Sequence, residues 1–450
     1  MIQKADQFRN WLIDKRFFRV GWFTKGTHTT SEVEESLTNL PEEISKQLEA
    51  AVNNLTANSH ETQAVLEPLE DAIAQWIENP NGANNSIVIL AQPVSPVSLI
   101  LGESLSQLKI KEKRQLDIKL IDWVERPPHS NSIRGKLEDQ LDIAELDRSQ
   151  EEQYSAEQIT IVPNLCWCFL RSAQGLNGID YIQDSVMNNN AQFVVLGCGQ
   201  IGWEYLKSTL KFHAYCDQVV HLPELTGKQL QEWIEPILSQ FDVQFSDAAL
   251  HKRIGDPNQL EDIHLSIEKP FETISEITQE ATATAKSSLR SVKEALEGGY
   301  DDSNDETSPK REYFDRLADI SDGVSIVALQ LFIRSLCYRK VIDPTQKDMR
   351  ETDEASNNQI VARLPKLPPL PDLSQNDLYL LYSLMLHGDL TIRSLAESLG
   401  DSTQVVNNQV QMLRNEGIIE QKNGVIKANP IHYPRLRKEL ANNNFIVEVS

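Results

Sequence analysis

Cysteine is scarce in this sequence, and so are the features of secreted and membrane-spanning proteins. The five cysteines form no framework of the kind that holds together a disulfide-rich secreted domain; they are Cys166, Cys168, Cys198, Cys216 and Cys337. The sequence shows no signal peptide and no apolar run long enough to cross a bilayer, so we expect a cytoplasmic protein.

Positive charge is also in short supply. The 43 Lys and Arg residues face 66 Asp and Glu residues, and the formal net charge is −23. Because contacts to phosphates need clustered Lys and Arg, this balance excludes a general nucleic-acid binder. Apolar residues make up 40% of the 450 positions, which is typical of a folded protein of about two to four domains.

The first 25 residues differ from the rest of the chain. They carry six basic residues against two acidic ones, a net +4, together with six Phe and Trp residues. One interpretation is a helix and a strand packed on the main body. The other is a docking element for a protein partner or an anionic membrane surface. Its predicted contact residues are Arg9, Trp11, Arg16, Phe17, Phe18, Arg19 and Trp22.

The middle of the chain alternates predicted strands and helices. The candidate strands are SIVIL, LDIKLIDWV, ITIVPNLCW, AQFVVLGC and CDQVVHL. Such alternation predicts an α/β domain with a parallel sheet covered by helices. The predicted segments are an N-terminal helical and docking segment (1–64), the α/β domain (65–250), a polar insertion or linker (251–312), a helical lid (313–363) and a proline-rich linker (364–373).

Residues 374–450 predict a winged helix-turn-helix. Ser374 is the expected cap of the first of three short helices, and a hairpin follows around Asn423-Gly424. Polar side chains of the presumed recognition helix and wing could meet DNA bases and phosphates; they are Gln404, Asn407, Asn408, Gln411, Arg414 and Lys422. Seven basic residues against eight acidic ones give this segment a charge of −1, which favours a protein partner over DNA.

The stretch SIVILAQPVSPVSLILGESL, residues 86–105, has the outline of a phosphate-binding loop without its chemistry. A working loop reads G-x-x-x-x-G-K-[ST] between a strand and a helix, so that backbone N–H groups, a lysine and a hydroxyl hold phosphate and magnesium. In that frame the sequence has Ala91, Pro96 and Val97 at the glycine, glycine and lysine positions, and only Ser98 matches.

With four further landmarks in order, the chain resembles the AAA-type or STAND-type P-loop ATPases over about residues 65–450. Pro163 and Asn164 stand where that family has an acidic pair, and Gly199 lies at its polar sensor position. The segment HLPELT resembles the entry to the helical lid, and Ile326 stands where the lid arginine would reach the γ-phosphate. The resemblance implies a P-loop-NTPase-like core with a lid and a winged helix.

Neutral and proline-bearing substitutes can neither bind magnesium nor stabilise a transferring phosphoryl group. We therefore expect no catalytic residues, no cofactor and no enzymatic activity, and we predict a scaffold that binds other proteins. The alternatives are a DNA-binding regulator that acts through the winged helix, an α/β domain unrelated to nucleotide binding, and an enzyme of other chemistry. For the last, CWC at 166–168 and Cys198 lack the spacing of a metal site, which favours structural cysteines and no bound metal.

Overall fold

The computed structural model describes residues 37–38, 40–80, 85–108, 117–123, 125–141, 158–188, 191–216, 218–245, 309–340 and 358–446. By its contacts the chain divides into one unit of Met1–Gln244 with Tyr313–Ser450 and a second unit, Phe245–Glu312, described only at its two ends. The predicted docking residues, from Arg9 to Trp22, lie outside the described residues. The first unit carries all of the architecture that follows.

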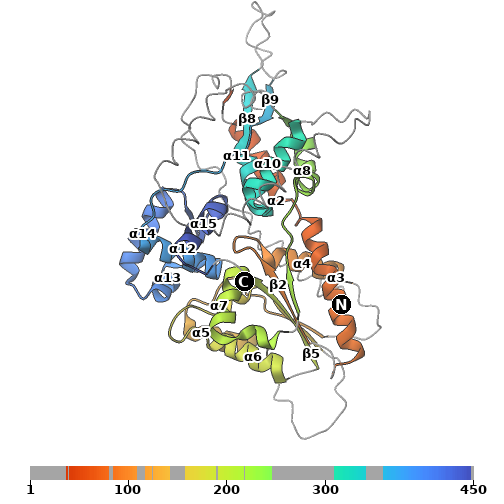
Figure 1. Ribbon diagram of the computed structural model, residues 1–450, viewed down its shortest axis with the longest axis vertical. Helices are drawn as coiled ribbons and strands as arrows, with labels where there is room; N and C mark the ends of the chain where they lie inside the picture. Colours follow the sequence, from red (N-terminus) through yellow and green to blue (C-terminus); the bar gives the residue numbers. More distant parts are fainter. Residues whose placement is uncertain are drawn as a thin grey trace, which may run out of the picture. The chain divides into compact units, whose positions relative to one another are not determined.

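A five-stranded parallel sheet forms the centre of this unit (Figure 1). Its strands are β2 (Ser86–Ala91), β3 (Asp117–Leu120), β4 (Gln158–Val162), β5 (Gln192–Gly199) and β6 (Gln218–His221). Each lies within one of the five predicted strands. The spatial order is β3-β4-β5-β2-β6, so the first strand along the chain lies between the fourth and the fifth. This parallel, helix-covered sheet confirms the predicted α/β class and its P-loop-NTPase-like core.

Helices cover both faces of the sheet (Figure 1). On one face, α3 (Ser59–Glu78) and α4 (Val97–Gln107) pack their apolar side chains against alternate residues of β2, β4 and β5. The other face is covered by α5 (Ser130–Leu141), α6 (Asn177–Asn188) and α7 (Gln200–Leu210). Because β2 is buried on both faces, it reads as a continuous apolar run rather than as an alternating one.

One predicted strand is wrong in its second half. The segment ITIVPNLCW was expected to be extended throughout, with Cys166 and Cys168 on one face of the sheet. Strand β4 ends at Val162, and Leu165–Trp167 form a 3₁₀ turn, η1. Pro163 has no N–H for the ladder, and the Asn164 side chain accepts a hydrogen bond from the Cys166 N–H at 3.1 Å, which starts the turn.

Shorter elements flank the sheet in the chain. They are β1 (Leu37–Thr38), α2 (Glu42–Asn53), η2 (Phe212–Tyr215), α8 (Gly227–Phe241) and β7 (Gln244–Phe245). Helix α8 begins after Thr226 with a capping box, where the sequence predicted a lid-entry helix. Helices α10 (Pro309–Ser321) and α11 (Ser325–Ser335) follow, and the antiparallel strands β8 (Leu336–Lys340) and β9 (Asn358–Ala362) come after them.

The C-terminal segment is a winged helix, as predicted. Its helices are α12 (Gln375–His387), α13 (Ile392–Leu399) and α14 (Thr403–Asn415), and a sheet of order β10-β12-β11 completes it with β10 (Leu390–Thr391), β12 (Val425–Ala428) and β11 (Ile419–Lys422). Ser374 caps α12 in a capping box. Asn423 and Gly424 take positive φ angles of 51° and 81°, which the tight hairpin requires. The turn η6 (Pro430–His432) and α15 (Tyr433–Asn442) follow the wing.

Candidate functional site

The loop between β2 and α4 uses its own polar groups to hold its shape. The Ser95 N–H donates to the Gln92 carbonyl and the Val97 N–H to the Ser95 carbonyl, each at 2.9 Å. Pro93 and Pro96 have no N–H to offer, and Pro96 is the residue that caps α4. A phosphate group would therefore find few free amide donors at this helix start.

Residues at the other predicted ATPase positions are also engaged in local structure. Ser98, the one match to a phosphate-binding loop, donates from its hydroxyl to the Pro163 carbonyl at 3.2 Å. Asn164 is used in capping η1. Ile326 lies near the start of α11, is 8% exposed and has an apolar side chain. Gly199 caps α7 and brings no side chain. The structure thus gathers these residues at one end of the sheet, where none of them supplies a charge.

The winged helix docks on this end of the sheet through a buried histidine. His387, the last residue of α12, accepts a hydrogen bond at Nε2 from the Arg171 N–H at 3.2 Å, so the proton of the neutral ring lies on Nδ1. That N–H donates to the Cys166 backbone carbonyl. The ring packs against Phe169 with centroids 4.9 Å apart. Burial and the nearby Arg126 guanidinium lower the pKa of His387 well below its ordinary value, so the ring stays neutral.

Arg126 joins the same contact from the loop after β3. Its side chain is 7% exposed, donates to the Phe169 carbonyl, and reaches the Asp389 carbonyl at 3.5 Å. Burial lowers the pKa of Arg126 to about 10, with the Asp389 carboxylate opposing the shift, so the guanidinium is charged at neutral pH. Since one partner is in the α/β core and the other is in the winged helix, this buried cation connects the two.

Three further contacts extend the docking surface. Arg171 donates from Nη2 to the Ser383 hydroxyl at 3.2 Å and to the Ser398 carbonyl at 3.3 Å. Glu397 accepts hydrogen bonds from the hydroxyls of Ser130 and Ser172. The third comes from α15 and η6, where the buried Tyr433 hydroxyl donates to the Gln92 side chain in the β2–α4 loop. The winged helix therefore contacts the loop that the resemblance identifies with phosphate binding.

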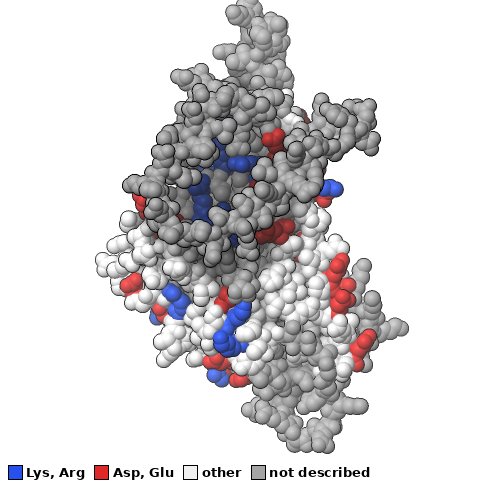
Figure 2. All heavy atoms as spheres, in the orientation of Figure 1, with Lys and Arg blue, Asp and Glu red and all other residues white. Residues whose placement is uncertain are grey.

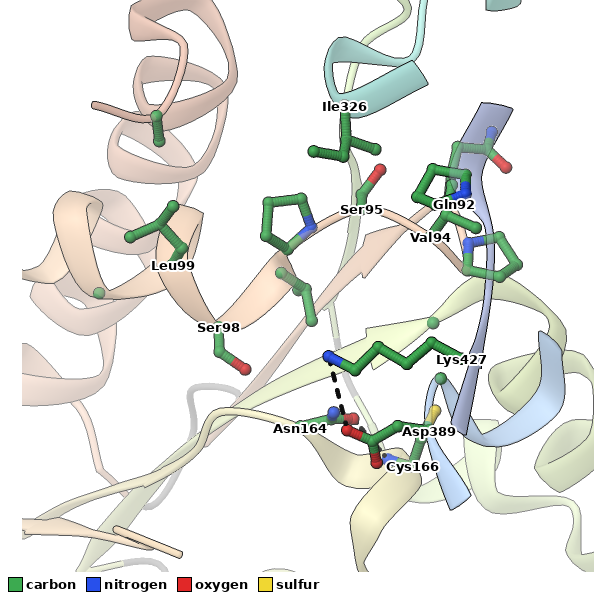
Figure 3. Close-up of a pocket in the computed structure, with 18 of the residues that line it drawn as sticks. Gln92, Val94, Ser95, Ser98, Leu99, Asn164, Cys166, Ile326, Asp389 and Lys427 are labelled. Carbon is green, nitrogen blue, oxygen red and sulfur yellow. Dashed lines mark hydrogen bonds and ion pairs between the residues drawn. The ribbon is translucent and has the colours of Figure 1, made fainter. Parts of the chain in front are cut away.

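A cavity of about 730 Å³ remains between the β2–α4 loop, α11 and the winged helix. Figure 3 shows Ser95 and Ser98 on one side of it, Ile326 above the loop, and Asp389 paired with Lys427 on the winged-helix side. The Lys427 ammonium lies 3.8 Å from the Asp389 carboxylate.

The charges that line the cavity are mostly negative. Three carboxyl groups, those of Glu103, Asp389 and Glu420, face one ammonium group, that of Lys427. Burial raises the pKa of Glu420 to about 7 and lowers the pKa of Lys427. A triphosphate would meet repulsion here, because only one cation opposes two permanently ionised carboxylates.

Helix α14 lies on a different surface, and its outer face is exposed. Gln404, Asn407, Asn408 and Arg414 are exposed, and so are the apolar Val405 and Met412, at 55% and 69%. Gln411 is half-buried, and Lys422 is exposed on the wing. On the face drawn in Figure 2 the surface over α13 and α14 is largely uncharged. Arg414 donates to the Gln421 side chain at 3.4 Å.

Two absences hold for the part of the chain that the structure describes. Among those residues no group of three or more His, Cys, Asp or Glu side chains is arranged to hold a metal ion. None of the described helices combines the length and the apolar character that crossing a membrane requires.

The residues that dock the winged helix were missed in the sequence. Arg126, His387, Asp389 and Lys427 carry no motif, and their partners are more than 200 residues away in three of the four printed contacts of Arg126 and His387. The one available signal is local: a histidine at the end of an otherwise apolar helix, followed by Gly388 and an acid.

Comparison with known proteins agrees with this architecture. Residues 373–420 match the family model described as "Winged helix-turn-helix DNA-binding". This segment is a winged helix-turn-helix. The match covers the C-terminal part of the chain alone, and no curated protein matches the sequence.

Solved structures with similar folds are AAA-type proteins. Cdc6p from Pyrobaculum aerophilum is 11% identical, with 86% of this chain and 95% of that chain covered and a TM-score of 0.30. The ORC2 protein of Aeropyrum pernix is 11% identical over 86% and 98%, with a TM-score of 0.32. The RuvB Holliday junction branch migration motor of Thermotoga maritima is 14% identical over 86% and 96%, with a TM-score of 0.24. Similarities at this level say nothing of a shared activity.

Proposed function

We propose that this protein is a cytoplasmic, catalytically inactive ATPase-like scaffold that binds other proteins. One observation carries the proposal: at the end of the sheet where a nucleotide would bind, Ser98 and Asn164 are used in local backbone hydrogen bonds and a winged helix is docked over the loop. Catalysis of phosphoryl transfer needs preorganised cations and donors, and this position supplies neutral groups.

The charges of the cavity support the same proposal. Among the described lining residues Lys427 is the only permanent cation, and it is paired with Asp389. A working site would instead present a lysine and a magnesium ion to the phosphates.

The partner surfaces in this proposal are the basic, aromatic N-terminal residues and the exposed face of α14. The first set is a prediction from sequence, with Arg9, Arg16 and Arg19 as its charged members. The second rests on exposed apolar side chains, Val405 and Met412, which lie two turns apart on one face of α14. An uncharged surface with isolated apolar residues is typical of a protein contact rather than of a phosphate contact.

Affinity capture with matched variants tests the scaffold function. The full chain is compared with V405D/M412D, with R9A/R16A/R19A, and with the control R435A/K438A, which removes two exposed cations of α15. We expect each of the first two variants to lose specific partners that wild type and the control retain. Identical partner sets for all four proteins would contradict the proposal.

A second function has one specific observation in its favour, the match of 373–420 to a DNA-binding family model. In this alternative α14 would enter the major groove, with Gln404, Asn407, Asn408 and Gln411 toward base edges. Arg414 and Lys422 would be the cations nearest to the phosphates.

A gel-shift assay at low and at moderate salt separates the two functions. DNA binding through α14 predicts sequence-selective retardation that weakens with salt, is lost in R414A/K422A and is kept in R435A/K438A. Because the net charge of the chain is −23, we expect no selective retardation.

A further inference from the structure

Two cysteine side chains meet at the carboxyl ends of neighbouring strands. The Sγ atoms of Cys166, in η1, and Cys198, in β5, lie 3.7 Å apart, and both residues are free thiols. They are 3% and 0% exposed. A disulfide bond needs about 2.05 Å between the sulfurs, so the two atoms must approach by about 1.7 Å. Such a closure is within the reach of a side-chain adjustment in the irregular η1 segment.

Only one of the two thiols lies on the wall of the cavity. Cys166 lines it, together with Ser106 and Gln107, which are exposed residues of α4. A small solute can therefore enter from the α4 side and reach Cys166. Cys198 is not among the lining residues and lies behind Cys166. This arrangement gives the pair an outer thiol, which meets the solute first, and an inner thiol.

The outer thiol also lies at the winged-helix contact. A Cβ atom placed on Gly202 of α7 would be 2.5 Å from the Cys166 Sγ and 3.0 Å from the Leu386 carbonyl of α12. The backbone carbonyl of Cys166 accepts the hydrogen bond from His387. Any shift of Cys166 toward Cys198 thus changes two contacts that hold α12 in place.

We propose that Cys166 and Cys198 are an oxidation site at which a hydroperoxide forms a disulfide and loosens the docked winged helix. The Cys166 sulfur attacks a peroxide oxygen and becomes a sulfenic acid, and the other oxygen leaves as water or alcohol. The Cys198 sulfur then attacks the sulfenic sulfur; the S–S bond forms, the S–O bond breaks, and the hydroxyl leaves as water with the Cys198 proton. Two thiols lose two electrons in total and the hydroperoxide gains them.

The direction of the pKa values agrees with these roles. The hydrogen bond with Cys198 lowers the pKa of Cys166, and burial raises the pKa of Cys198. The outer thiol is thus the better nucleophile toward the peroxide. In a reducing compartment such a disulfide would be transient, as is typical of redox-responsive pairs.

Mass spectrometry of the full-length protein tests the disulfide. After hydrogen peroxide and then alkylation, we expect wild type to lose two hydrogen atoms and to yield a Cys166–Cys198 linked peptide. C198S should form no disulfide and should accumulate sulfenic acid at Cys166. C168S is the matched control, because Cys168 is equally buried in the same segment. It should behave as wild type.

Trypsin cleavage after the exposed Lys366, in the segment before α12, tests the effect on docking. Peroxide should accelerate this cleavage at least about threefold in wild type and in C168S, and leave C198S unchanged. The proposal is overturned if no linked peptide forms, if C198S forms the same species, or if oxidised wild type is cleaved at the unoxidised rate. These results do not depend on whether the protein binds ATP or other proteins.

Discussion

The β2–α4 loop and helix α14 are the two places where a protein of this architecture would be expected to meet phosphate, and they differ in every physical respect. The loop is closed: its N–H groups bond within the loop, Ser98 bonds to the Pro163 carbonyl, and Tyr433 of the winged helix bonds to Gln92. Helix α14 is open, with exposed side chains that are mostly uncharged. Loss of charge is therefore accompanied by intramolecular contacts at one place and by an available surface at the other.

The largest expected effect on this contrast comes from removing Arg126. The variant R126M leaves the Phe169 and Asp389 carbonyls without their buried donor. We expect the free energy of unfolding to fall by about 3 kcal/mol, as measured by urea denaturation. The closed loop should become accessible while α14 stays as it is.

An exposed arginine provides the control for R126M. Arg134 is 54% exposed and pairs with Glu138 along α5, so R134M should change stability by less than about 0.5 kcal/mol. Equal losses for the two variants would mean that Arg126 does not hold the winged helix in place.

The next effect is pH-dependent and concerns Glu61, which accepts a hydrogen bond from Ser325 at the start of α11. Burial raises its pKa to about 7 from an ordinary value of 4.5. The folded state binds this proton more tightly than the unfolded state, so the stabilising contribution is present at low pH and is lost as the pH rises toward 7 and above.

The variant E61Q keeps the acceptor and cannot ionise. Relative to wild type, its free energy of unfolding should rise by roughly 3 kcal/mol between about pH 5 and about pH 8. A constant difference between the two proteins across this range would show that Glu61 is not protonated in the folded state.

A smaller effect is expected where α7 approaches the winged helix. In G202A the added Cβ would be 2.5 Å from the Cys166 Sγ, which forces a shift and costs about 2 kcal/mol. Gly135 of α5 offers the matched control, because nothing lies within 4 Å of an added Cβ there. G135A should gain about 0.5–1 kcal/mol from helix propensity. Thermal unfolding of both variants measures the difference, and a stable G202A would contradict the close packing.

The smallest effect belongs to the ion pair in the cavity. Lys427 is 38% exposed and 3.8 Å from Asp389, so K427M should lower stability by at most about 1 kcal/mol. The wing-tip variant K422M, at an exposed position, is the control and should be neutral. A loss for K427M as large as that of R126M would reverse the ranking of the two contacts.

Local patterns were enough to predict most of the elements. The five apolar runs between residues 86 and 222 each contain a strand of the sheet, and Ser374 and Asn423-Gly424 mark the start of α12 and the turn of the wing. The substitutions at Pro96, Val97 and Ile326 were also readable, because a phosphate site has a fixed residue pattern.

Two kinds of feature were not readable from local patterns. Strand β4 ends early because Pro163 and the Asn164 cap act after an apolar run that would otherwise continue. The docking of the winged helix depends on contacts such as that of Arg126 with Asp389, 263 positions apart, which no local period reports. The same holds for Cys166 and Cys198, whose contact follows from the neighbouring positions of β4 and β5.

Titration calorimetry of the full-length protein with ATP and magnesium tests the central claim most directly. Because the phosphate position offers prolines, closed amides and a docked winged helix, we predict no saturable binding up to about 1 mM nucleotide. Magnesium-dependent binding with a micromolar Kd would show that this end of the sheet still holds a triphosphate, and would contradict the account.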